Sequence, residues 1–397
     1  MSASLSRRTL GGGVLALAVL AGTGTSGVAA AATNGTPWFG VISPTRFTPS
    51  QLVAAGVRRV TLSVGWDVYE PSSGTVNTQY VSQLRTLLAG YRAAGMSVVL
   101  DPGLQYPPSW VFSLPGQTRF VNQYGDTWRG PLSEDVPDYV FNPALRQVVE
   151  RYLRQLAIDL GASSFVSVRV GGLLSGELRY PLQSFNGHNG CLWGYGSSAQ
   201  AGAPRPGWTP GTGTTGDAAA FLQYYCNSLS SYAYWLLLQL GTNFPRTDMT
   251  LVLPSWGLRP GMAEEAVAAR LTGGTTGEVN GMVAGGLDWV TQVAVLAHTK
   301  LPATVYTTWL DAPDYGTTPQ LQAPVRYLAT LAAGNGLPLA GENTGGGGSS
   351  ALQRTLGLVA PLPLTGVMWM NGDALANNAD GLDLRGVSQG LRAYNLA

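Results

Sequence analysis

The sequence predicts one (β/α)8 barrel, a TIM barrel, over residues 33–397, with long loops after several strands. Short apolar segments alternate with segments of helical periodicity, and this alternation recurs eight times along the chain. Parallel strands need a crossover that is usually a helix, so the alternation favours a parallel sheet. The first strand-to-helix turn lacks a Gly-x-Gly-x-x-Gly pattern, which disfavours the rival doubly wound nucleotide-binding sheet. Eight units with enlarged loops suit the length of the chain.

The first half of the chain gives clear start and stop signals. Leucines and tyrosines recur at helical spacing before Gly95 ends the helix. Asn142 followed by Pro143 forms an N-cap and first-turn pair. A long aromatic loop at 104–139 is of a length that is uncommon unless the loop is functional. The expected elements are strand 38–42, helix 48–55, strand 58–64, helix 76–94, strand 96–100, helix 143–160 and strand 166–170.

The second half repeats the alternation with more glycine. A second long loop, 182–215, is rich in Gly, Pro, Trp and Tyr, and Asp217 is predicted to cap the helix that follows. A Gly/Ser tract at 345–350 is predicted to be flexible. The expected elements are helix 217–240, strand 249–253, helices 262–271 and 287–298, strand 303–308, helix 324–333, a strand from 337 to the Gly-Glu pair, helix 351–359, strand 365–370 and a helix from 384 to the end.

The N-terminus predicts a twin-arginine signal peptide over residues 1–32. Arg7 and Arg8 precede an apolar Gly/Ala-rich run at 11–21, and small residues follow through 29–32. This order is that of the charged region, apolar region and cleavage site of an exported protein. The apolar run is too short to span a bilayer comfortably. We therefore expect a bacterial protein that is secreted, periplasmic or in the cell envelope, with no membrane association after cleavage.

Composition excludes several classes of chemistry. The formal net charge is +1, which gives no electrostatic case for nucleic acid or an anionic membrane. Lys300 is the only lysine, and the two histidines form no zinc-spaced cluster with cysteine. We infer neither a metal nor an organic cofactor. The sequence is silent on the oligomeric state.

Export permits disulfides, and the chain has two cysteines, Cys191 and Cys226. They could pair, which would stabilise the fold by constraining the unfolded chain. The alternative is two buried thiols, which behave as small apolar side chains. The sequence leaves this question open.

Two glutamates stand at comparable places in the predicted barrel. The apolar run 166–170 ends in glycines before Glu177, and a second apolar run stops at Gly341-Glu342. Active sites of TIM barrels lie at the C-terminal ends of the strands. Glycoside hydrolysis needs two carboxyl groups there, one to protonate the leaving oxygen and one to attack the sugar or activate water. Either glutamate alone reads equally well as a surface residue.

Aromatic and acidic residues recur at the same predicted strand ends. Tryptophan and tyrosine can cover the faces of a sugar ring, while carboxylates bind its hydroxyl groups. Packing is the alternative for each tryptophan, and helix capping or loop hydrogen bonding is the alternative for each aspartate. The expected carbohydrate contacts are Trp66, Asp67, Asp101, Tyr106, Trp110, Trp256, Trp309, Asp311 and Trp369.

Two motifs resemble those of a known family. Ser175-Gly176-Glu177-Leu178-Arg179-Tyr180-Pro181 resembles the motif around the general acid of the β-amylases, glycoside hydrolase family 14. Ala340-Gly341-Glu342-Asn343 resembles the motif around that family's general base. The resemblance implies that Glu177 is the general acid, that Glu342 activates water with inversion, and that Arg179, Tyr180 and Asn343 contact the sugar.

A third segment departs from that family. Where the β-amylases carry a Gly-Gly-Asn-Val-Gly-Asp lid, this chain has the run 101–110 with a Pro-Pro-Ser-Trp sequence. Together with the Trp66 to Gly74 segment, that run resembles the family 42 β-galactosidases, which are retaining enzymes with Asn-Glu at the fourth strand. Here Gly176 precedes Glu177.

The sequence thus predicts an exported glycoside hydrolase that acts on an oligo- or polysaccharide, with a β-amylase-like inverting mechanism favoured. The alternatives are a retaining β-galactosidase-like enzyme, a transglycosylase, and a carbohydrate-binding barrel without catalysis. The glycan, its linkage and the choice between end-wise and internal cleavage stay open.

Overall fold

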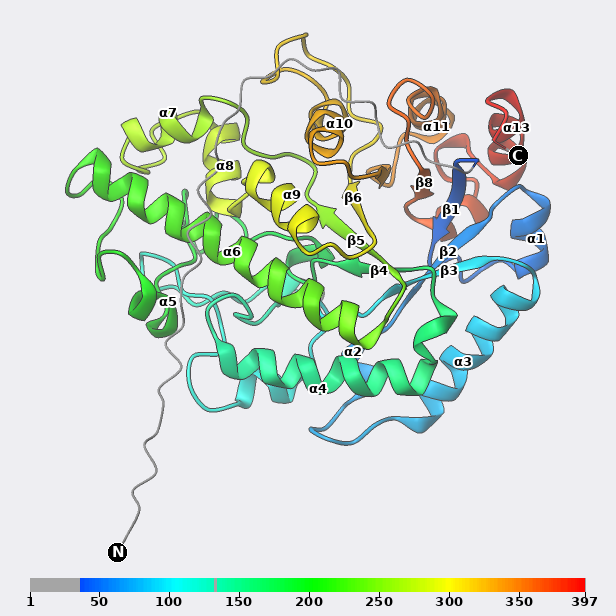
Figure 1. Cartoon of the computed structure of the whole chain (residues 1–397), viewed down its shortest axis with the longest axis horizontal. Helices are drawn as coiled ribbons and strands as arrows, with labels where there is room; N and C mark the ends of the chain where they lie inside the picture. The colour runs from blue at the N-terminus through cyan, green and yellow to red at the C-terminus, as the bar shows by residue number, and fades with distance from the viewer. Residues whose placement is uncertain (1–35, 132–133, 397) are drawn as a thin grey trace, which may run out of the picture.

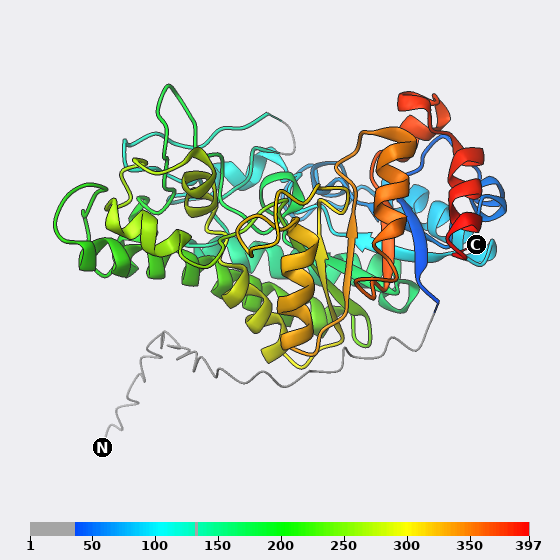
Figure 2. The same cartoon turned by 90° about the horizontal axis from the view of Figure 1, so that it is seen from above.

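The computed structural model describes residues 36–131 and 134–396. Eight parallel strands close into a barrel in chain order, and the first strand pairs with both the second and the eighth. The helices surround this barrel, and the C-terminal helix lies beside the N-terminal elements in both views (Figures 1 and 2). The predicted (β/α)8 fold is confirmed. The predicted signal peptide at 1–32 lies outside the described residues.

All the predicted strands form, with ends that differ by a few residues. Their central residues are buried on both faces, as expected for a parallel sheet that is covered by helices. The strands are β1 (Trp38–Ile42), β2 (Arg59–Ser63), β3 (Ser97–Asp101), β4 (Ser167–Val170), β5 (Asp248–Leu253), β6 (Ala303–Thr307), β7 (Leu339–Glu342) and β8 (Gly366–Trp369).

The helices include short ones that periodicity did not predict, namely α2, α5, α8 and α12. The α-helices are α1 (Pro49–Ala54), α2 (Trp66–Tyr69), α3 (Thr78–Ala93), α4 (Pro143–Leu160), α5 (Ser197–Gly202), α6 (Thr215–Asn243), α7 (Met262–Ala268), α8 (Gly277–Gly285), α9 (Trp289–His298), α10 (Pro324–Gly334), α11 (Gly348–Gly357), α12 (Gly372–Ala376) and α13 (Leu384–Ala393). Single 3₁₀ turns are η1 (Ser109–Ser113), η3 (Ala162–Ser164), η4 (Leu174–Gly176) and η5 (Ala379–Gly381).

Capping explains where the two long helices begin. The Asn142 side chain accepts a hydrogen bond from the backbone N–H of Ala144 at 2.9 Å, so α4 starts as predicted. Helix α6 begins earlier than predicted. Thr214 is its N-cap, and Asp217 is the third residue of a reciprocal capping box with Thr214. The prediction that Asp217 itself caps the helix was wrong by one turn.

The two long loops pack against each other through their aromatic side chains. The Trp128 ring, from the first loop, lies 5.3 Å from the Trp193 ring and 5.0 Å from the Phe185 ring of the second loop. Trp128 and Trp193 are both fully buried. The aromatic content of these loops therefore serves packing at these positions.

The cysteines do not form a disulfide. Cys191 accepts a hydrogen bond from the Asn122 side chain at 3.4 Å, and Cys226 lies within α6. Both thiols are free and buried. Of the two alternatives that the sequence left open, the structure has the two buried thiols, which pack as small apolar groups.

The core has two parts of very different size. The larger part lies between the barrel and the helices. The part inside the barrel is small and consists of Val99, Val252, Tyr306, Ala340 and Met368. Barrel interiors are usually filled with layers of bulky branched side chains. This interior instead contains polar and charged groups, and they shape the site.

A buried carboxyl in the first long loop makes stability depend on pH. Burial raises the pKa of Asp138 to about 7, and the N–H of Phe141 and the charge of Arg146 offset this only in part. The folded protein therefore binds a proton more tightly than the unfolded chain does. The contribution of Asp138 to the free energy of unfolding is fully present below the ordinary pKa of an aspartate and is lost as pH rises toward 7.

We expect Asp138→Asn to remove this fall, because the amide accepts the same backbone hydrogen bond without a charge. Denaturant unfolding between pH 4 and 8 should show that, as pH rises, the free energy of unfolding of the variant increases relative to that of the parent, by an amount on the order of a few kcal/mol. The exposed Asp380→Asn is the control. Parallel curves for the parent and Asp138→Asn would contradict the prediction.

Candidate active site

A tight turn after β4 presents Glu177. Gly176 donates its N–H to the carbonyl of Leu173 at 2.8 Å and accepts the N–H of Gly172 at 3.1 Å. Gly172 has φ +66°, and a Cβ there would lie 2.8 Å from the Cβ of Leu104. Only glycine fits this conformation and this close approach. The glycines read from the sequence thus turn the chain out of the barrel just before the carboxylate.

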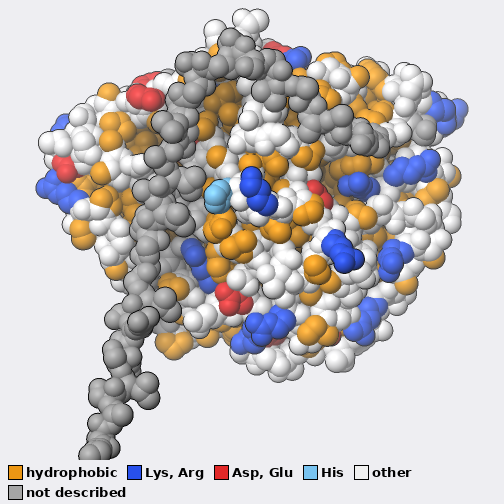
Figure 3. All heavy atoms as spheres, in the orientation of Figure 1, with side chains coloured by type: hydrophobic (Ala, Val, Ile, Leu, Met, Phe, Trp, Pro, Cys, Tyr) orange, Lys and Arg blue, Asp and Glu red, His pale blue; other side chains and the backbone are white. Residues whose placement is uncertain are grey.

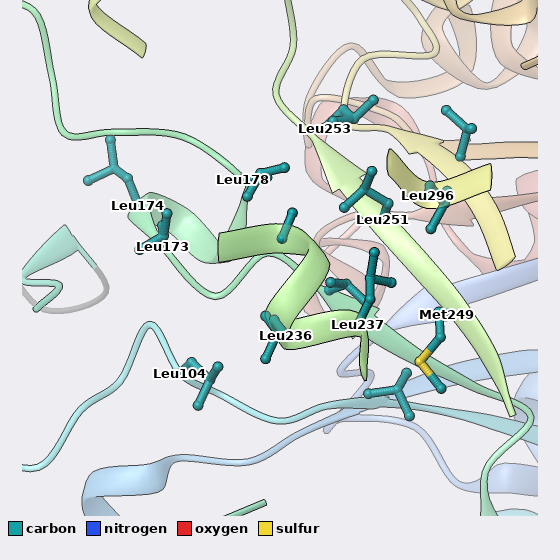
Figure 4. Packing of buried hydrophobic residues seen from close by; sticks show 14 of the residues in the cluster. Leu104, Leu173, Leu174, Leu178, Leu236, Leu237, Met249, Leu251, Leu253 and Leu296 are labelled. Atoms are coloured by element: carbon teal, nitrogen blue, oxygen red, sulfur yellow. The ribbon is translucent and has the colours of Figure 1, made fainter. Parts of the chain in front are cut away.

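Leucines on both sides of Glu177 anchor the turn. Leu173, Leu174 and Leu178 are buried and lie near strand β5 and helix α6 (Figure 4). The N–H of Leu178 donates to the carbonyl of Val252 in β5 at 3.0 Å. These contacts fix the backbone on both sides of Glu177, so its side chain has a defined position at the strand end.

Glu177 lies in an environment suited to a general acid. Its side chain is 14% exposed, and the nearest Nη atom of Arg179 is 3.9 Å from its carboxylate. Burial raises the pKa of Glu177, while Arg179 and the Thr308 hydroxyl oppose the rise and the charge of Glu342 adds to it. The contribution of Glu342 to the pKa of Glu177 indicates that the two carboxyl groups lie close enough to interact electrostatically. Glu177 thus holds its proton to a higher pH than an exposed glutamate does.

Glu342 ends β7 and points into the barrel, where a cation and a phenol hold it. Arg169 Nη1 lies 2.8 Å from Oε2, and Nη2 lies 3.5 Å from Oε1. The hydroxyl of Tyr306 donates to Oε2 at 2.7 Å. A Cβ at Gly341 would lie 2.7 Å from the carbonyl of Thr307, so glycine lets β7 approach β6 closely here. Side chains from two strands, β4 and β6, therefore hold this carboxylate.

Arg169 and Tyr306 are the functional residues that sequence reasoning missed. Burial lowers the pKa of Arg169, but the charge and hydrogen bond of Glu342, together with Tyr306 and Asp101, outweigh it and raise that pKa. A signal for Arg169 was present, because an arginine within a buried strand needs a charged partner. No comparable signal marked Tyr306, since tyrosine is common in strands.

Several predicted carbohydrate contacts lie around the two glutamates. Trp256 and Trp309 follow β5 and β6, and their rings are 6.1 Å apart. Asp101 ends β3 and accepts hydrogen bonds from the Gly103 N–H and the Gln105 side chain. Tyr106 and Asp67 are exposed beside them, and the N–H of Asp67 donates to the carbonyl of Tyr106. These residues and Arg179 follow strands at the C-terminal end of the barrel, which we call the mouth.

Other predicted contacts have structural positions instead. Trp66 stacks on Tyr152 of α4 at 4.5 Å, and Tyr180 stacks on Tyr225 of α6 at 4.0 Å. Trp369 belongs to the buried core outside the barrel. All three face the helical layer, so the expectation that they touch sugar does not fit the structure. The reason is that their side chains pack against the helices rather than into the mouth.

The remaining predicted contacts tie loops together. The indole N–H of Trp110 donates to the carbonyl of Glu70 at 2.9 Å. Asp311 accepts the N–H of Thr344 at 3.0 Å, and Asn343 accepts the N–H of Met370 at 2.7 Å. The Asn343 amide nitrogen is buried without a protein partner. Asp311 and Asn343 thus position the loops after β6, β7 and β8.

A metal site and a membrane-spanning helix each place requirements on the described part of the chain. Among residues 36–131 and 134–396, no group of three or more His, Cys, Asp or Glu side chains is placed to hold a metal ion. No helix in these ranges has both the length and the apolarity to cross a bilayer. On the face drawn in Figure 3, charged side chains are scattered rather than gathered into one patch.

The fold resembles that of solved carbohydrate-active enzymes. The catalytic domain of a β-amylase from Paenibacillus polymyxa superposes with a TM-score of 0.67 at 18% identity, covering 90% of this chain and 97% of that one. A β-galactosidase from the psychrophilic Marinomonas ef1 superposes with a TM-score of 0.59 at 11% identity, covering 90% of this chain and 59% of that one. A β-galactosidase from Halorubrum lacusprofundi superposes with a TM-score of 0.58 at 14% identity, covering 90% of this chain and 57% of that one.

No family model matches the sequence, and a comparison with curated proteins finds no match. At these low identities the structural likeness establishes the fold. The β-amylase and β-galactosidase barrels are the two types that the sequence motifs resemble, and both types are glycoside hydrolases. The chain spans nearly the full length of the β-amylase catalytic domain but under two thirds of each β-galactosidase.

The ion pair inside the barrel predicts a measurable cost. We expect Arg169→Met to lower the free energy of unfolding by about 3–5 kcal/mol, because it leaves the Glu342 carboxylate buried without a cation. Tyr306→Phe removes one hydrogen bond to a charged group and should cost about 1.5–3 kcal/mol. Denaturant unfolding measures both. The exposed Arg154→Met is the matched control, and an Arg169→Met loss no larger than that of the control would contradict the account.

Proposed function

We propose that the protein is an exported glycoside hydrolase in which Glu177 protonates the leaving oxygen and Glu342 acts on the opposite face of the sugar. The observation that carries this proposal is the contrast between the two carboxyl groups. Glu177 is desolvated with a raised pKa, whereas Glu342 is paired with Arg169 and Tyr306. Two carboxyls whose environments differ in this way suit an acid and a base of one reaction.

The proposed mechanism follows from these positions. Glu177 donates its proton to the glycosidic oxygen as the bond to the anomeric carbon breaks. Glu342 accepts a proton from the water that attacks that carbon, and the product sugar leaves with inverted configuration. Arg169 and Tyr306 hold the Glu342 carboxylate toward the mouth. Trp256 and Trp309 are placed to cover sugar faces, and Asp67 and Asp101 to bind hydroxyl groups.

The two motifs and the likeness to the β-amylase domain favour an inverting enzyme of that type, with an α-1,4-glucan as the first substrate to try. A retaining β-galactosidase-like enzyme is the alternative, and the Pro-Pro-Ser-Trp run favours it. Proton NMR of the first product formed distinguishes the two by its anomeric configuration. Galactans and arabinans complete the panel, and transfer to added sugar acceptors would indicate a transglycosylase.

The twin arginine at positions 7 and 8 supports export in the folded state. Replacing both by lysine in the full chain should retain the protein in the cytoplasm, with its precursor mass intact. Unchanged export of that variant would contradict this part of the proposal.

Glu177→Gln should lower kcat by about 10²–10⁴-fold on the glycan that the parent cleaves, because general acid catalysis is lost while the shape is kept. Reducing-sugar release measures this. Glu264→Gln, the same change at an exposed site on α7, should leave turnover unchanged. Glycan binding without turnover in the parent, unaffected by Glu177→Gln, would point to a carbohydrate-binding protein instead.

The charge of Arg179 predicts a shift in pH dependence. Arg179 lowers the pKa of Glu177, so Arg179→Gln should raise it and keep the acid protonated to higher pH. The alkaline limb of the kcat/KM profile should therefore move to higher pH, while the exposed Arg154→Gln leaves it in place. An alkaline limb that stays fixed or moves to lower pH in Arg179→Gln would be inconsistent with Glu177 as the acid.

A further inference from the structure

The end of the barrel opposite the glutamates is hollow. A cavity of about 210 Å³ lies among the first residues of the strands. One water needs roughly 10–15 Å³ measured in this way, so the space is many times larger than a single water site. Among the described residues the cavity is partly open rather than enclosed. It is therefore accessible to a small solute.

The wall on one side is a ring of hydroxyl groups around a carboxylate. Thr304 donates to Asp248 Oδ1 at 3.0 Å, while Thr250 and Ser167 donate to Oδ2 at 3.1 and 3.3 Å. Thr61 adds a further hydroxyl from β2. No arginine or lysine among the described residues forms an ion pair with Asp248, so three hydroxyl groups hold this carboxylate. The Ser167 and Thr250 hydroxyls also hydrogen-bond to each other, so one of these two uses an acceptor lone pair inside the group.

On the other side is a cation without an acceptor. The Arg59 guanidinium lies 4.2 Å from the centre of the Trp38 ring. Within residues 36–131 and 134–396, its side chain has neither a hydrogen bond nor an ion pair to a protein oxygen. Burial lowers the pKa of Arg59 to about 10, although the negative charge of Asp248 opposes this fall, so the group is still charged at neutral pH. A planar guanidinium with free N–H groups matches the two oxygens of a carboxylate.

We propose that this cavity binds a small carboxylate that carries hydroxyl groups, of the size and chemistry of an aldonate or a uronate. Its carboxylate pairs with Arg59, and its hydroxyl groups meet Asp248 and the serine and threonine hydroxyls across the cavity. Arg169 lines the same cavity and holds Glu342 on its other side. The site is thus distinct from the mouth that carries Glu177, and the proposal does not depend on the enzymatic function.

Isothermal titration calorimetry with D-gluconate and D-glucuronate tests the proposal, with D-glucose as the neutral comparison. We expect saturable binding of one or both acids and weaker binding of glucose. Arg59→Gln should weaken binding about tenfold or more, because it removes charge-assisted hydrogen bonds. Arg58→Gln is the matched control, since that neighbouring arginine is exposed and donates to the carbonyl of Val53 outside the cavity.

Three results would overturn the proposal: no saturable binding of either acid, equal affinity in Arg59→Gln and the parent, or equal loss in both arginine variants. Hydrogen–deuterium exchange on the parent covers the case in which Arg59→Gln does not fold. Gluconate should then protect the first residues of β2 and β5. Protection confined to the segments around Glu177 and Glu342 would assign the ligand to the mouth and refute the cavity site.

Discussion

An ion pair inside the barrel, between Arg169 and Glu342, is the interaction on which the rest of the site depends. Removing both charges from water costs several kcal/mol for each ion, and only close geometry and further hydrogen bonds offset that cost. The structure provides both, through the two guanidinium contacts and the Tyr306 hydroxyl. The barrel interior has consequently given up bulky branched layers for a few polar groups and a cavity beneath them.

Strands β4 and β6, which supply the partners of Glu342, also set the different environment of Glu177. Strand β4 supplies Arg169, and Glu177 follows seven residues after Val170, the last residue of that strand. Strand β6 supplies Tyr306 to one carboxylate, and Thr308 just beyond it to the other. Glu342 is paired closely with Arg169, whereas burial of Glu177 outweighs the more distant Arg179 and raises the pKa of Glu177. That difference is what a pair of carboxyl groups needs to divide acid and base roles.

Much of the fold could be predicted because its signals are local. Alternating apolar runs, an Asn-Pro start and glycine stops each report the conformation of nearby residues, and all the predicted strands form. The site was predictable only in part. Glu177 and Glu342 carry recognisable glycine turns, but the direction of Trp66, Tyr180 and Trp369 depends on which face of the barrel each side chain joins. Whether Cys191 and Cys226 pair stayed open at the sequence level for a similar reason, since spacing along the chain does not report distance in the fold.

The protonation state of Glu177 is the most direct test of this account. Infrared difference spectroscopy of the protein, with the carboxyl stretch followed across pH and Glu177→Gln as the reference, measures it without any substrate. The account predicts a protonated carboxyl that titrates above the ordinary range of glutamate and is missing in the variant. A Glu177 that titrates at or below that range, while another carboxyl of the mouth holds the proton, would contradict the assignment of acid and base.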